Sequence, residues 1–145
     1  MKKNGIGGIL LIGLSSVIAI GFGGLFLSES IWSSMYQSDS RYQTLHAKVF
    51  AFRPNNPFVK PYDGRADYRE MEAIADSYQT QAGITAFILS LIWAGGGVFA
   101  ARVVAQKYKT PPVLYLVAFG IIPGILAFIG WRQIINARRP ATQPI

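Results

Sequence analysis

The chain has 145 residues, of which 51% are hydrophobic and only 14% charged, with a formal net charge of +7. This length suits a single domain, and the charged share is about half that of an average soluble domain. The absence of cysteine excludes disulfides, thiolate metal sites and cysteine nucleophiles. We therefore expect one membrane domain covering residues 1–145.

The positive charge is unevenly distributed along the chain. All seven acidic residues lie between Glu29 and Asp76, in a segment that also holds six basic residues. The other eight basic residues flank the apolar stretches, which is typical of membrane orientation rather than of nucleic-acid binding. We expect the lipid bilayer, and no nucleic acid, as a partner. The residues expected to meet anionic lipid headgroups are Arg102, Lys107, Lys109, Arg138 and Arg139.

The first apolar stretch covers residues 5–27 and follows Lys2 and Lys3. Ala19-Ile20-Gly21 would be a passable signal-peptidase site, but 23 uncharged residues exceed a usual signal sequence. We interpret the stretch as a retained transmembrane helix.

An extramembrane segment is expected over residues 28–81. The first helix should continue to about Ser38, and the alternating pattern of Thr44–Phe52 predicts a short strand. A run of Pro, Asn and Gly residues then predicts turns. From residue 67 to 81 the apolar residues recur at spacings of three and four, which predicts an amphipathic helical extension with Asp67 as its N-cap.

This extension should lead directly into a second transmembrane helix over residues 82–104. Ala82–Ala101 contains twenty residues without a charge, enough to span a bilayer. No proline occurs between Asp67 and Lys109, so the pattern predicts one helix about 65 Å long, ended by Pro111 and Pro112.

The third apolar stretch covers residues 113–131 and precedes a basic tail, 132–145. We interpret the chain as an all-α integral membrane protein with three transmembrane helices. Its N-terminus would be cytoplasmic and residues 28–81 extracytoplasmic, in a bacterial inner membrane. Three full spans, however, put the tail's arginines outside, against the positive-inside rule. The alternative is a kink or re-entrant hairpin at Pro123-Gly124, which would leave all eight flanking basic residues inside.

Small residues repeat at fourth positions on each apolar stretch and predict close helix–helix contacts. They are Ser15, Ala19, Gly23, Ala82, Ala86, Ser90, Ala94, Gly97, Gly120 and Gly124. One interpretation is packing among the chain's own helices; the other is docking against a helix of another subunit.

Residues for catalysis are not recognisable. His46 is the single histidine, and no HExxH, GxSxG or P-loop motif occurs. The uncharged runs 5–27, 82–101 and 113–131 contain no Asp, Glu, Lys, Arg or His, the residues on which proton relays and ion-coupled carriers usually depend. We expect no catalytic residue, cofactor or metal site. The leading hypothesis is a non-catalytic accessory or scaffolding subunit of a membrane complex, whose partners are other membrane subunits. The alternative is self-association into a homo-oligomeric channel or lysis-type pore. An enzyme using carboxylates of residues 63–76 is a third hypothesis.

Overall fold

The computed structural model describes residues 3–51 and 63–138, and 93% of it is helix, with no strand in these ranges. The helices are α1 (Lys3–Ser38), α2 (Ser40–Ala51), α3 (Arg65–Lys107), α4 (Val113–Phe119) and α5 (Ile121–Arg138). The chain divides into two compact units. Unit 1 combines Met1–Gly24 with Ile88–Ile145, and unit 2 is Leu25–Phe87. Each unit is described by itself.

Two helices, α1 from Gly5 to Ser38 and α3, are long and apolar enough to cross a bilayer. Helices α4 and α5 would supply a third crossing only if they counted as one span, because the chain bends by 118° between them. The third apolar stretch is therefore two helices rather than one straight span.

Unit 2 joins the second half of α1 to the amphipathic start of α3. The buried apolar residues of α3 in this unit are Met71, Ile74, Ala82 and Ala86, whereas Tyr68 is exposed. Across the pair, the indole Nε1 of Trp32 donates a hydrogen bond of 2.6 Å to the carbonyl oxygen of Ala75. These contacts hold the extension of α3 against α1 over several turns.

The strand expected at Thr44–Phe52 is wrong, because the described part of that segment, up to Ala51, belongs to helix α2. Its partly buried apolar residues are Tyr42, Leu45 and Val49, at spacings of three and four. That is the helical period, and the alternation seen in the sequence was coincidental. Asp39 caps the helix, since its Oδ1 accepts a hydrogen bond of 2.8 Å from the backbone N–H of Arg41.

The N-cap predicted at Asp67 is also wrong. Helix α3 starts at Arg65, and the carbonyl of Gly64 already accepts the first helical bond, from Tyr68 N–H. Asp63 accepts a longer hydrogen bond, 3.3 Å, from the N–H of Arg65. Asp67 instead forms an ion pair of 2.7 Å with Lys48, which links the first turn of α3 to α2.

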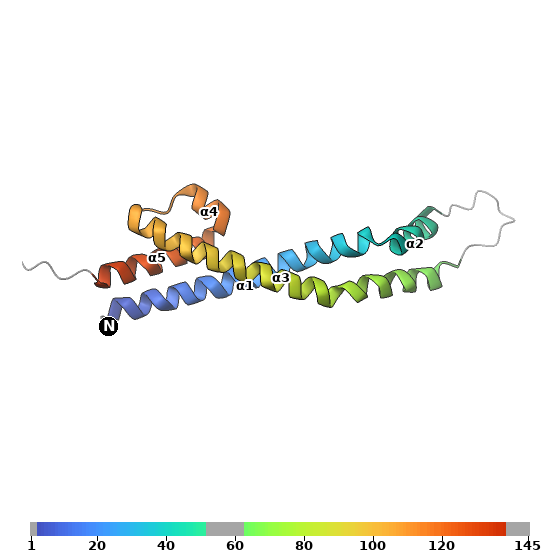
Figure 1. Cartoon of the computed structure of the whole chain (residues 1–145), viewed down its shortest axis with the longest axis horizontal. Coiled ribbons are helices and arrows are strands. Elements are labelled where there is room, and N and C mark those ends of the chain that lie inside the picture. The colour runs from blue at the N-terminus through green and yellow to red at the C-terminus, as the bar shows by residue number, and fades with distance from the viewer. Residues whose placement is uncertain (1–2, 52–62, 139–145) are drawn as a thin grey trace, which may run out of the picture. The chain divides into compact units, whose positions relative to one another are not determined.

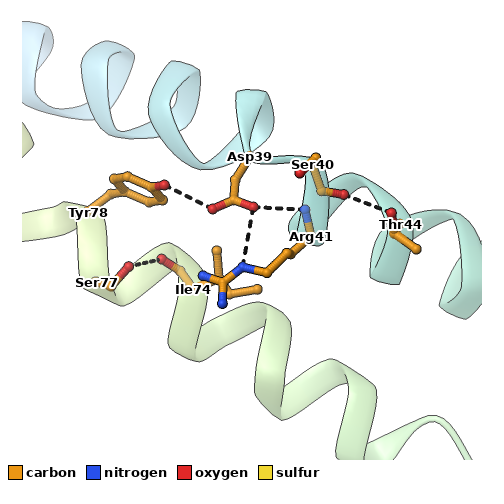
Figure 2. A network of polar contacts seen from close by, with 7 residues as sticks. All are labelled: Asp39, Ser40, Arg41, Thr44, Ile74, Ser77 and Tyr78. Atoms are coloured by element: carbon orange, nitrogen blue, oxygen red, sulfur yellow. Dashed lines mark hydrogen bonds and ion pairs between the residues drawn. The ribbon is translucent and has the colours of Figure 1, made fainter.

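The junction of α1 and α2 is connected to α3 by a polar network (Figure 2). The hydroxyl of Tyr78 donates to Oδ2 of Asp39 at 2.9 Å, while Oδ1 serves the cap of α2. This hydrogen bond lowers the pKa of Asp39 below its usual value, with help from the N–H of Arg41. The same bond raises the pKa of Tyr78. One carboxylate therefore caps α2 and binds α3.

Unit 1 contains the first half of α1, the second half of α3, and the pair α4 and α5. Figure 1 shows that α5 turns back from α4, so that its C-terminal end lies at the same end of this unit as the start of α1. The core consists mostly of small and aromatic side chains: Ala19, Ala94, Ala101, Ala105, Tyr115, Phe119, Ala127 and Phe128. Such a core lets helix backbones approach closely, as membrane helices require.

Candidate functional site: the hairpin and basic end of unit 1

Helices α4 and α5 form a hairpin whose turn is Gly120. This residue has φ +93°, a left-handed conformation that glycine adopts without steric cost. Proline three residues later cannot donate the N–H that would continue a helix through the turn. Pro123 and Gly124 were the residues expected to bend the chain; the break itself falls three residues earlier than Pro123.

Three side chains donate hydrogen bonds to backbone carbonyls on or beside this turn. Ser15 of α1 donates to the carbonyl of Pro123 at 2.7 Å. Trp93 of α3 donates to that of Ala118 at 3.0 Å, and Tyr115 of α4 to that of Gly124 at 3.2 Å. Polar backbone that leaves a regular helix is costly in an apolar setting unless it is bonded in this way. The bonds tie the hairpin to both long helices.

The residues predicted for helix packing lie inside the chain. Ser15, Ala19, Ala82, Ala86, Ser90 and Ala94 are all buried, each at most 2% exposed. Gly23 lies against Trp93 and Ser90, and Gly124 against Leu116 and Tyr115. At Gly97, a Cβ atom would collide with the ring of Phe119. The two packing positions predicted on the third apolar stretch have different roles. Gly120 forms the turn between α4 and α5, whereas Gly124 lets α5 approach Leu116 and Tyr115 of α4.

A close approach between the backbones of α1 and α5 was not expected from the sequence. A Cβ atom added to Gly8 of α1 would lie 2.5 Å from the carbonyl oxygen of Gly130 of α5. A Cβ atom added to Gly130 would lie 2.7 Å from the carbonyl oxygen of Gly8. The two backbones therefore touch. The sequence contains both glycines, but neither belongs to the fourth-position repeat of small residues on its helix.

Other glycines on the long helices are covered by no atom of residues 3–51 or 63–138. Added Cβ atoms at Gly13, Gly21, Gly83, Gly95 and Gly96 would meet no described atom within 4 Å. Gly95 and Gly96 of α3 lie between the exposed side chains of Ile92 and Phe99, which are 68% and 67% exposed. We call this pair the glycine notch.

Basic residues gather at one end of unit 1. Arg102 of α3 lies over the ring of Trp131, 5.4 Å from its centroid. Arg132 of α5 donates to the carbonyls of Tyr108 and Ala105 at 3.3 and 3.5 Å, near the end of α3. This position suits a cation, since the last carbonyls of a helix lack intrahelical partners. Lys107, Lys109 and Arg138, predicted to meet lipid headgroups, are exposed, and Arg139 lies outside the described residues.

A groove of about 420 Å³ runs between α1 and α5 beside the crossing of Gly8 and Gly130. It is lined by Gly5, Ile9, Ile12, Trp131, Ile134, Ala137 and Arg138. Trp131 is fixed there by a hydrogen bond of 3.0 Å from its Nε1 to the carbonyl of Val98. Within the described ranges, no group of three or more His, Cys, Asp or Glu side chains could hold a metal ion.

No protein-family model, curated protein or solved structure matches this chain.

Proposed function

We propose that this chain is a non-catalytic accessory or scaffolding subunit of a larger membrane assembly. In this proposal α1 and α3 cross the bilayer, and α4 and α5 enter it as a re-entrant hairpin. The N-terminus and the basic tail are cytoplasmic, residues 28–81 are extracytoplasmic, and the membrane is a bacterial inner membrane.

The length of the hairpin supports the re-entrant arrangement. Its returning helix has eleven uncharged residues, Ile121–Trp131, before Arg132. At 1.5 Å per residue these extend about 16 Å, roughly half of the hydrocarbon core. The hydrogen bonds from Ser15, Trp93 and Tyr115 to the hairpin backbone remove the main cost of placing a turn at that depth.

The interior of unit 1 supports a non-catalytic role. Among all described residues, the buried polar side chains are Ser15 and Ser90. Ser15 is bonded to the hairpin, and Ser90 packs beside Gly23 and Gly24. Proton relays and ion-coupled carriers depend on ionisable groups within the membrane. None of the described residues of unit 1 is acidic, and its basic residues gather at one end.

The observation that carries the accessory role is the glycine notch. Glycine weakens a helix, and in membrane helices its usual compensation is close contact with another helix. Gly97 has that contact in Phe119, whereas Gly95 and Gly96 have none within the described chain. A notch between Ile92 and Phe99 would accept a ridge of a partner's transmembrane helix.

The partner hypothesis is tested with Gly96→Leu. Leucine fills the notch, favours helix and remains compatible with lipid. We expect normal amounts of the variant in the membrane and normal stability of the isolated chain, but loss of its partner in native mass spectrometry after purification in mild detergent. The control is Ile88→Leu, which exchanges one exposed apolar side chain of α3 for another outside the notch. Retention of all partners by Gly96→Leu would refute the role of the notch.

The same spectra separate the accessory role from the alternative. A heteromeric complex supports an accessory subunit, whereas a closed ring of identical chains would support a homo-oligomeric channel or pore instead. An isolated monomer from gently solubilised membranes would contradict both.

Topology is tested with single cysteines, since the chain has none of its own. Cysteines at Gln106 and Thr142 should both be protected from an impermeant thiol reagent in intact cells. A cysteine at Ala47, exposed on α2, should react. Reaction at Thr142 together with protection at Gln106 would show instead that the third stretch spans the membrane.

A further inference from the structure

We propose that the groove between α1 and α5 binds one anionic phospholipid, with an acyl chain along the groove and the phosphate at Arg138. This inference rests on the proposed membrane topology, which places the basic end of unit 1 at the cytoplasmic headgroups. It assigns a ligand and does not depend on any protein partner.

The lining of the groove favours a hydrocarbon chain over a peptide. Its walls are the side chains of Ile9, Ile12, Ile134 and Ala137, and the ring of Trp131. The indole N–H of Trp131 is already donated to Val98, so it offers no hydrogen bond to an occupant. A peptide would bring backbone N–H and C=O groups into these walls and leave them unpaired, which is costly. An acyl chain has no such groups.

The crossing of Gly8 and Gly130 explains why a groove exists here. Where the two backbones touch, no side chain separates them. Beside this crossing the groove is lined by Ile9 and Ile12 of α1 and by Ile134 and Ala137 of α5. The space between them lies next to Arg138, at the end of α5.

Charge complementarity selects an anionic headgroup. The guanidinium of Arg138 makes no ion pair or hydrogen bond with residues 3–51 or 63–138. Unit 1 contains eight basic residues and no acidic one, so the protein offers this guanidinium no carboxylate partner there. Arg102 adds positive charge nearby, 5.4 Å from the ring centroid of Trp131, which lines the groove. Basic pockets between transmembrane helices on the cytoplasmic side are a known setting for anionic headgroups.

The test uses the full chain, purified and stripped of lipid in detergent, then titrated with phosphatidylglycerol or phosphatidylcholine of identical acyl chains. Binding is followed by native mass spectrometry and by the shift in melting temperature. We expect tighter binding of phosphatidylglycerol. Arg138→Gln should weaken that binding about fivefold, the effect of one basic residue near an anionic surface. It should weaken phosphatidylcholine binding less, because the choline cation of that lipid neutralises the charge of its phosphate. Ala137→Phe, which fills the groove, should weaken binding of both lipids.

The matched control is Lys107→Gln, which removes one exposed positive charge outside the groove. An equal loss of phosphatidylglycerol binding in this variant would overturn the site, because it would show attraction to diffuse charge.

Stabilisation by glycerol phosphate equal to that by the lipid would overturn the role of the groove, as would unchanged lipid binding by Ala137→Phe. A dimer that Ala137→Phe abolishes, with no lipid bound to the wild type, would identify a second copy of the chain as the occupant and also overturn the proposal. Because the assay contains only this chain and lipid, it can fail while the accessory role is retained, and the reverse also holds.

Discussion

The contact of α1 with α5 at Gly8 and Gly130 allows a quantitative test of the hairpin. In Gly8→Ala, the new Cβ would lie 2.5 Å from the carbonyl oxygen of Gly130 and 2.8 Å from Cγ1 of Ile134. Ordinary van der Waals contact begins at 3.4 Å, so the two helices must separate by about 0.9 Å or bend. Overpacking of a filled contact typically costs about 1–3 kcal/mol.

The matched control is Gly13→Ala on the same helix, where the added Cβ meets no described atom within 4 Å. Both substitutions gain the same helix propensity, roughly 1 kcal/mol, and this gain cancels in the comparison. Gly8→Ala should therefore be less stable than Gly13→Ala by about 1–3 kcal/mol. The measurement is reversible unfolding of each variant in mixed micelles, monitored by circular dichroism.

A double variant, Gly8→Ala with Gly130→Ala, adds a further constraint. The two substitutions open the same contact, so their effects should not add. If Gly8→Ala is as stable as Gly13→Ala, α5 does not lie against α1 as described, and the folded-back hairpin is refuted.

Three other predictions concern single interactions. Ser15→Ala should destabilise the protein by roughly 0.6 kcal/mol, the average for a hydrogen bond between membrane helices, in the same unfolding assay; Ser16→Ala is the control because Ser16 bonds only within α1. Tyr78→Phe should raise the pKa of Asp39 towards its ordinary value of 3.8 in an NMR titration. Since the folded pKa of Asp39 is depressed, its stabilising contribution is present above the unfolded value and is lost as pH falls through the folded one, so the wild type should lose more stability than Tyr78→Phe below about pH 4. Amide exchange should be slow over Met71–Tyr78, where Met71 and Ile74 are buried, and free-peptide rates there would contradict an ordered extension of α3.

The long helices could be predicted because their signals are local. An uncharged run and the absence of proline predicted one continuous helix over Asp67–Lys109, and α3 covers Arg65–Lys107. Helix α3 starts before the predicted residue, because the N-cap is the residue whose oxygen is placed to accept a hydrogen bond from the free N–H groups of the first turn. Asp63 and Gly64 accept the hydrogen bonds from the N–H groups of Arg65 and Tyr68. Asp67 makes an ion pair with Lys48 instead.

Helix α2 was missed because twelve residues contain too few turns for its period to be distinguished from alternation. The residues expected to pack helices could be found from small-residue spacing, but the side chains that hold the hairpin could not. Trp93, Tyr115 and Trp131 are each an ordinary aromatic residue in an apolar stretch. They stabilise the hairpin because they donate hydrogen bonds to backbone carbonyl groups. These carbonyl groups are either distant in sequence or left without a helical partner by the turn at Gly120.

The arginines of the tail show why the fold and the charge pattern have to be considered together. With three straight spans, Arg132 would lie across the membrane from the end of α3, against the positive-inside rule. In the structure its guanidinium bonds to the carbonyls of Ala105 and Tyr108, and the neighbouring Trp131 bonds to that of Val98. A straight third helix would have to break both contacts and also the bond from Ser15 to Pro123. The hairpin keeps these contacts and at the same time gathers the basic residues at one end of unit 1. Packing and charge therefore support the same topology, and Arg132 contributes to both.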